Sequence, residues 1–100
     1  MRRVQWSQAA LADLEAQLVH IAVDNPAAAR KIALRLRETG DALARFATGH
    51  PGRISGTYEK SVRGLPYIVA YALTDNHTAI SVLRVIHTSR HWDEASFPEA

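Results

Sequence analysis

The apolar pattern of this chain changes its period once, at His50-Pro51-Gly52. Before that point apolar residues recur every three or four positions, which is typical of helices, and after it they form short runs typical of strands. A chain that separates helices from strands in this way is expected to form an α+β domain. Its 100 residues suffice for one hydrophobic core and not for two, so a single domain over residues 1–100 is predicted.

The first helix is predicted over residues 8–23, with Ser7 as its N-cap. Its apolar residues form one stripe at spacings of three and four, namely Leu11, Leu14, Leu18 and Ile21. The polar side chains between them, among them Asp13, are expected to face water.

A second helix is predicted to follow directly, because Asp24-Asn25-Pro26 combines a helix stop with a capping residue and a proline suited to a first helical position. We expect it to end near Gly49, with Gly40 as a weak point in its interior. Its apolar stripe consists of Ile32, Leu36, Leu43 and Phe46. The short connection requires the two helices to form an antiparallel hairpin.

Four segments have the pattern of strands. Arg3–Trp6 alternates before the first helix, and Thr57–Arg63, Tyr67–Thr74 and Thr78–His87 follow the second. The last three are joined by short turns, which make them antiparallel neighbours. The predicted order is β-α-α-β-β-β, with the helical hairpin packed on a small, mainly antiparallel twisted sheet of about four strands.

Composition excludes several classes of protein. The chain has no cysteine, which rules out disulfides and thiolate chemistry. Its apolar runs are well short of the roughly 20 residues that cross a bilayer, and it begins without an apolar leader, so a cytoplasmic protein without membrane contact is expected. The formal net charge is only +2. No cofactor is expected, and a metal site at His87 and His91 lacks a third nearby ligand.

Several motifs, taken in order, resemble the RelE/ParE family of toxins from bacterial toxin–antitoxin modules. After the strand and helical hairpin come His50-Pro51-Gly52-Arg53, then Gly64–Tyr71, then Leu83-Arg84-Val85-Ile86-His87 and Arg90-His91-Trp92. The end of the last strand is similar to the ParE, or plasmid-stabilisation, branch. The resemblance covers nearly the whole chain.

The resemblance implies a protein that halts bacterial growth and is neutralised in a hetero-oligomer with a cognate ParD-like antitoxin. Members of the ParE branch act on DNA gyrase, whereas RelE-type relatives cut messenger RNA on the ribosome. A non-toxic relative that only binds an antitoxin is a third alternative. The low net charge favours gyrase, because an RNA-walled site rewards strong positive charge.

Cleavage of RNA would need a general base, a general acid and fixed positive charge. Glu59 or His87 is the candidate base and His91 the candidate acid. The candidate phosphate clamp consists of Arg53, Arg63, Arg84 and Arg90. However, the lysines and the C-terminal tyrosine of the RelE pattern are missing, since Lys60 is the only lysine on the middle strands and no tyrosine follows Tyr71. A gyrase inhibitor without its own catalysis is therefore favoured.

The residues expected to contact the target are Arg53, Arg84, Arg90 and Trp92. Arg84 interrupts an apolar strand, so its charge requires either a groove or a carboxylate, for which Glu59 and Asp13 are candidates. Strand alternation places His87 on the face opposite Arg84. The two side chains are thus not expected to form one site.

Overall fold

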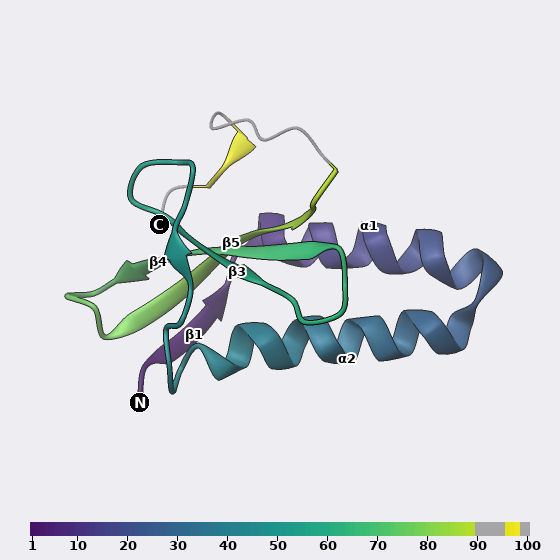
Figure 1. Cartoon of the computed structure of the whole chain (residues 1–100), viewed down its shortest axis with the longest axis horizontal. Coiled ribbons are helices and arrows are strands. Elements are labelled where there is room, and N and C mark those ends of the chain that lie inside the picture. The colour runs from purple at the N-terminus through teal and green to yellow at the C-terminus, as the bar shows by residue number, and fades with distance from the viewer. Residues whose placement is uncertain (90–95, 99–100) are drawn as a thin grey trace.

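The structure is a computed structural model, which describes residues 1–89 and 96–98 (Figure 1). Its elements follow the predicted order with one addition, a two-residue strand before the second predicted strand. They are β1 (Arg3–Trp6), α1 (Gln8–Asp24), α2 (Pro26–Ala42), β2 (His50–Pro51), β3 (Tyr58–Ser61), β4 (Tyr67–Thr74) and β5 (Ala79–His87). The prediction of an α+β domain is confirmed. No helix in the described part of the chain is long and apolar enough to cross a membrane.

The five strands form one sheet in the order β1-β5-β4-β3-β2. All neighbours are antiparallel except β1 and β5, which run parallel because the helical hairpin carries the chain between them. The sheet is therefore mainly antiparallel, as predicted. The strand that was not predicted, β2, pairs only with Tyr58 and Glu59. It is too short to leave a pattern in the sequence.

Capping residues define the helical hairpin. The hydroxyl oxygen of Ser7 accepts a hydrogen bond from the backbone N–H of Ala10 at 3.0 Å and starts α1. Asn25 serves both helices, because its backbone N–H donates to the carbonyl of Ile21 while its side-chain oxygen accepts from the N–H of Ala28. One residue thus closes α1 and opens α2, which forces the sharp reversal seen at the end of the hairpin (Figure 1).

The second helix ends at Ala42, seven residues before Gly49, so the predicted end is wrong. Three successive i to i−3 hydrogen bonds tighten the chain after Gly40, and the N–H of Arg2 binds the carbonyl of Ala44. The residue just before β1 thus binds a carbonyl that a longer helix would use itself. As a result Phe46 is 72% exposed, although its spacing had placed it on the core stripe.

Gly40 is not a weak point of α2 but a requirement of its packing. A Cβ atom at this position would lie 2.3 Å from Cζ2 of Trp6, so only glycine lets the indole ring of β1 rest on the helix. The indole N–H also donates to the carboxylate of Asp41 at 3.2 Å. Packing between β1 and α2 therefore offsets the low helix propensity of glycine.

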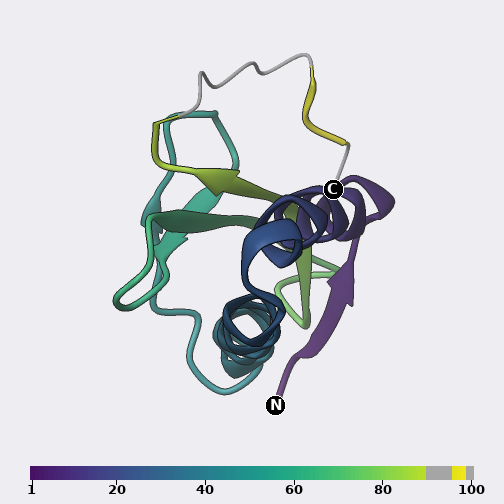
Figure 2. The same ribbon diagram turned by 90° about the vertical axis from the view of Figure 1, so that its right-hand side faces the viewer.

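Both helices cover one face of the sheet, which we call the helix face (Figure 2). Alternate residues of β4 and β5 point into this core, where they meet Leu14 of α1 and Leu36 of α2. The buried strand residues of this layer are Tyr67, Val69, Tyr71, Ile80, Val82 and Val85. The opposite face, called the far face, carries Ala70 and Arg84, which lie opposite each other on β4 and β5.

A β-bulge in β5 determines which side chains reach the far face. Ala70 pairs with Arg84, but Tyr71 already pairs with Val82, so Leu83 is an extra residue on β5. The bulge keeps Val82 and Val85 both in the helix-face core while Arg84 points the other way. It is the local feature that positions this arginine.

Candidate functional site

Arg84 forms a bidentate ion pair with Asp13 of α1. Its Nε and one terminal nitrogen each donate to a carboxylate oxygen of Asp13 at 2.7 Å, and its other terminal nitrogen donates to the carbonyl of Ser96 at 3.0 Å. The two side chains are only 24% and 14% exposed. Of the two partners considered from the sequence, Asp13 is the one that the structure shows, and the prediction that Asp13 faces water is wrong.

The reason that Asp13 reaches β5 is that β1 is shorter than its neighbour. The pairing of β1 ends at Val82, so the rest of β5 presents a free backbone edge on that side. The hydroxyl of Ser7 donates to the carbonyl of Leu83 at 2.9 Å, and Asp13 accepts from the N–H of Val85 at 2.9 Å. The side chains of Ser7, the N-cap of α1, and of Asp13 therefore bind the backbone groups of β5 that β1 does not reach.

A second guanidinium–carboxylate pair, between Arg53 and Glu59, holds the loop before β3. Glu59 accepts from the backbone N–H of Arg53 at 2.8 Å and from its Nε at 3.2 Å. The carboxylate side chain is 4% exposed, whereas that of Arg53 is 53% exposed. Because Glu59 is buried against its own loop, its oxygens are engaged in holding that loop.

The two pairs lie on the same face of the sheet. Glu59 pairs with Ala70 across β3 and β4, and Ala70 pairs with Arg84 across β4 and β5. The small Ala70 side chain thus separates them, and two strand spacings of about 4.8 Å place Glu59 and Arg84 about 10 Å apart. The far face therefore brings Arg53, Glu59 and Arg84 into one neighbourhood.

His87 is on the helix face, as strand alternation predicted. It pairs with Tyr67, whose ring it meets edge-on at a centroid distance of 5.3 Å. Its Nδ1 lies 2.8 Å from the hydroxyl of Ser89. His87 and Glu59, the two candidate bases, thus occupy opposite faces of the sheet.

Arg63 is also separated from the far-face pairs. It lies in the turn between β3 and β4, where its carbonyl accepts a hydrogen bond of 2.8 Å from Arg35 of α2. The remaining candidates from the sequence, Arg90, His91 and Trp92, lie outside the described residues. No group of three metal-ligating side chains occurs among residues 1–89 and 96–98.

Two side chains of this region have shifted pKa values. The hydrogen bonds to Asp13 raise the pKa of Arg84 further above its ordinary value, so it remains a cation at every pH at which the protein folds. Burial raises the pKa of Tyr71, whose hydroxyl accepts from the N–H of Gly49 at 3.0 Å. Neither shift creates a group that exchanges protons near neutral pH.

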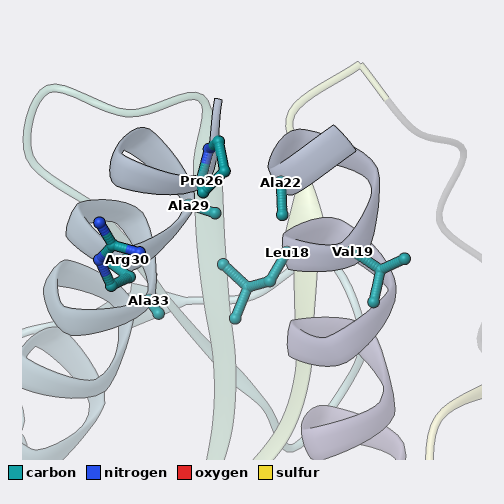
Figure 3. Close-up of a pocket in the computed structure, with 7 residues that line it drawn as sticks. All are labelled: Leu18, Val19, Ala22, Pro26, Ala29, Arg30 and Ala33. Carbon is teal, nitrogen blue, oxygen red and sulfur yellow. The ribbon is translucent and has the colours of Figure 1, made fainter. Parts of the chain in front are cut away.

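An apolar groove between the helices, which we call the hairpin groove, was not predicted from the sequence. It has a volume of about 340 Å³ and lies near the end of the hairpin (Figure 3). Leu18 and Ala22 of α1 face Pro26, Ala29 and Ala33 of α2 across it, Val19 borders it on the side of α1 away from α2, and Arg30 is its one charged lining residue. The side chains of Ala29 and Ala33 are small, so they leave a hollow between the two helices.

Comparison with known proteins agrees with this architecture. Residues 4–92 match the family model described as the ParE toxin of type II toxin–antitoxin systems. The chain is 33% identical to Y4kP, a toxin candidate of Sinorhizobium fredii, over 93% of this chain and 95% of the relative. It is 34% identical to the toxin RelE2 of Caulobacter vibrioides, over 90% and 99% of the two chains.

Solved structures share the fold. A chain of the chromosomal ParDE system from P. aeruginosa superposes with a TM-score of 0.81 at 24% identity, covering 89% of this chain and 98% of the other. A chain of the RelBE2 toxin–antitoxin complex of Mycobacterium tuberculosis gives 0.60 at 26% identity, covering 86% and 96%. A helical hairpin on one face of a mainly antiparallel sheet is thus the fold that this chain shares with members of the RelE/ParE class. The chain belongs to the ParE toxin family of type II toxin–antitoxin systems.

Proposed function

We propose that this ParE-family toxin inhibits bacterial growth by acting on DNA gyrase in the cytoplasm, and that a cognate ParD-like antitoxin neutralises it in a hetero-oligomer. Family membership supports the general activity. The choice of gyrase rests on one observation, which is that the two candidate bases, Glu59 and His87, lie on opposite faces of the sheet and are engaged in contacts of the fold.

An RNA-cleaving site requires a base and an acid that can both reach one phosphodiester. Glu59 is buried with its oxygens bound to Arg53, and His87 lies on the other face beside Tyr67. Arg84 is held by Asp13 in a geometry that satisfies both carboxylate oxygens. These contacts stabilise the fold and leave the candidates without a shared substrate position, which favours an inhibitor that acts by binding.

The residues proposed to contact the target are Arg53, Arg84, Arg90 and Trp92. Arg53 and Arg84 support this proposal by their position, since both lie on the far face, and the guanidinium of Arg53 is more than half exposed. Arg84 would act there as a fixed positive charge behind the surface, because its terminal nitrogens are already bound. Arg90 and Trp92 enter this proposal on the resemblance alone.

The proposed antitoxin contact is the hairpin groove. The groove is lined by apolar side chains of both helices, and one of them, Val19, is 61% exposed, so this surface suits an amphipathic helix. The solved relatives are described as toxin–antitoxin systems or complexes, which supports a protein partner. Exposed apolar surface of this kind is usually covered by a partner in the cell.

The alternative function is a ribosome-dependent mRNA endonuclease of the RelE type. It is supported by the similarity to a relative named RelE2, of which the chain covers 99%. A non-toxic protein that only binds the antitoxin is the third alternative.

One experiment separates these functions. The chain is purified with the product of the neighbouring gene, freed from it, and added to gyrase with plasmid DNA and, separately, to ribosomes translating a defined mRNA. We expect loss of supercoiling activity or trapped DNA breaks, and an intact mRNA. Cleaved mRNA with unaffected gyrase would replace the proposal by the RelE-type activity. No effect on either target, together with normal growth on expression, would identify a non-toxic relative.

A further inference from the structure

The end of the helical hairpin extends beyond the strands of the sheet (Figure 1). In α1, all of whose residues the structure describes, Ala10 and Leu14 are buried and no residue after Leu14 is. The segment that follows Leu14 is nevertheless rich in leucine, isoleucine, valine and alanine. The core of the domain therefore leaves apolar side chains at the end of the hairpin incompletely covered.

The outer side of the hairpin, which points away from the sheet, carries exposed apolar side chains. Val23 follows the buried Leu14 by about two and a half helical turns, so it lies on the opposite side of α1. Leu34 precedes the buried Leu36 by about half a turn and lies on the corresponding side of α2. Val23 is 79% exposed, and Val19, one turn before it, also borders the hairpin groove. Exposed apolar surface of this kind is typical of a contact with another protein molecule.

The charged side chains of the hairpin are divided between its two helices. α1 contains three carboxylates, those of Asp13, Glu15 and Asp24, and neither lysine nor arginine. The first twelve residues of α2, Pro26 to Arg37, contain four cations and no carboxylate. The hairpin thus places an acidic helix beside the basic part of another helix.

The fold itself uses only some of these charges. Asp13 binds Arg84. Arg35 donates to the turn between β3 and β4, and Arg37 lies over the ring of Trp6. The remaining carboxylates and cations of these two stretches form none of the ion pairs that join residues described by the structure: Glu15, Asp24, Arg30 and Lys31. All four side chains are exposed, so they can pair with charges of another molecule.

The position of Asp24 is unfavourable within its own helix. It is the last residue of α1, where the partial negative charge of the helix end repels a carboxylate. The last turn of α1, which the structure describes in full, contains no basic side chain that would compensate for this repulsion. A cation supplied by a second molecule would compensate for it.

Two copies of this hairpin have complementary outer sides. If two hairpins meet face to face about a two-fold axis that runs along them, α1 of each copy lies against α2 of the other, and each contact occurs twice. Arg30 and Lys31 lie five and six positions after Asn25. Asp24 and Glu15 lie one and ten positions before it, so the cations of one copy are placed between the levels of the two carboxylates of the other. A partner with one sign of charge would match only one of the two helices.

We propose that the chain, when free of antitoxin, associates with a second copy of itself through the outer side of the hairpin. In this dimer the exposed apolar side chains of α1 contact α2 of the other copy, and the unpaired charges pair across the interface. The self-association does not depend on the proposed function. Its consequence does, because the proposed antitoxin contact lies at the same end of the hairpin, so the dimer and the antitoxin complex exclude each other.

Sedimentation equilibrium of the chain purified without antitoxin tests the association. We expect the mean mass to rise from 11.0 kDa toward twice that value as the concentration increases from about 1 µM to about 300 µM, because a small contact of this kind is weak. A mass of 11.0 kDa at every concentration would overturn the proposal. Masses that continue to rise beyond that of a dimer would also overturn it, since a two-fold contact closes after two copies.

Substitution of the exposed valines tests the surface. The double variant Val19→Ser and Val23→Ser should weaken dimerisation about tenfold or more, because each copy loses two apolar side chains from the interface. The matched control is Phe46→Ser, which removes another exposed apolar side chain, outside the two helices. The control should dimerise as the unchanged chain does, and circular dichroism checks that both variants fold. A valine variant that dimerises as well as the control would overturn the choice of surface.

Charge reversal tests the pairing of α1 with α2. One variant carries Glu15→Lys and Asp24→Lys, and the other carries Arg30→Glu and Lys31→Glu. Each variant alone should remain monomeric where the unchanged chain is dimeric, because like charges now meet in its own dimer. An equal mixture of the two should form a heterodimer, in which opposite charges meet at both contacts. A mixture that remains monomeric would overturn this arrangement of the helices.

The antitoxin distinguishes this inference from the proposed function. A chain that dimerises but does not bind the product of the neighbouring gene would support the dimer and refute the proposed antitoxin contact. A chain that binds this product, yet stays at 11.0 kDa without it, would refute the dimer alone. If the antitoxin binds the dimer without separating its two copies, their mutual exclusion is refuted.

Discussion

The two faces of the sheet are stabilised in different ways. The helix face is a continuous apolar layer in which Val69, Tyr71 and Val82 are completely buried under the helices. The far face carries two guanidinium–carboxylate pairs on either side of Ala70. The comparison teaches that charged residues on the sheet of a protein of this family need not form a catalytic site. Here the two ion pairs hold a helix and a loop against the sheet.

The two pairs of the far face also differ from each other. Arg84 and Asp13 are 71 residues apart and join α1 to β5, whereas Arg53 and Glu59 are six residues apart and hold one loop. Loss of the first pair should therefore affect the whole domain, and loss of the second should mainly loosen residues 52–57. Two predictions follow from this difference and a third tests the helix face; they are given in order of decreasing effect.

The substitution Arg84→Ala should have the largest effect. It leaves the Asp13 carboxylate, which is 14% exposed, without its cation, and we expect a loss of about 2–3 kcal/mol in the free energy of unfolding. Urea denaturation of the variant and the unchanged chain measures this loss. The double variant Arg84→Met with Asp13→Leu should recover part of it, since no buried charge remains. A stability equal to that of the unchanged chain would show that the pair is not structural.

The substitution Glu59→Gln should have a smaller and more local effect. The glutamine oxygen can still accept from the N–H of Arg53, but the ion pair is lost, so we expect a decrease of about 1–2 kcal/mol. Amide hydrogen exchange should accelerate in residues 52–57 and remain unchanged in β5. Global destabilisation greater than that of Arg84→Ala would contradict the assignment of Glu59 to its loop.

The substitution Tyr71→Phe tests the helix face and should cost about 1 kcal/mol, because it removes only the hydrogen bond from Gly49. Burial raises the pKa of Tyr71 above 10.0, so the folded state disfavours the ionised phenol. The stability that the buried, protonated Tyr71 phenol contributes is fully present below pH 10. It decreases as the pH rises above that value, because the phenol of the unfolded chain loses its proton first. Denaturation between pH 8 and 11 should show a weaker decline for the phenylalanine variant than for the unchanged chain, and equal slopes would refute this role.

Much of the fold could be predicted from local patterns. Ser7, Asn25 and Pro26 determine the helix boundaries of the hairpin through contacts with residues three or four positions away. The alternation in β4 and β5 placed Tyr67, Val69 and Tyr71 on one face, and it also separated His87 from Arg84. These features depend on neighbours in the sequence, which is why periodicity and capping rules detect them.

The contacts of the candidate site could be predicted less well from such local patterns. The spacing of α1 indicated that Asp13 faces water, but the short length of β1 exposes the edge of β5 to it. The pattern of α2 indicated that Phe46 is buried, but the chain leaves the helix at Ala42 to enter the sheet. In both cases a hydrogen bond to the backbone of a distant segment contributes, from Val85 to Asp13 and from Arg2 to Ala44.

The sequence by itself determined the fold class, the order of elements and the resemblance to the ParE family, because each of these depends on residue types at short, regular spacings. Only the tertiary structure decided that Arg84 pairs with Asp13, that Glu59 binds its own loop, and that an apolar groove lies between α1 and α2. The physical reason is that ion pairs and grooves form between surfaces that are distant in the chain. The partners of an ion pair are determined when the helices pack on the sheet, because a buried charge pairs with an opposite charge that the folded structure places near it.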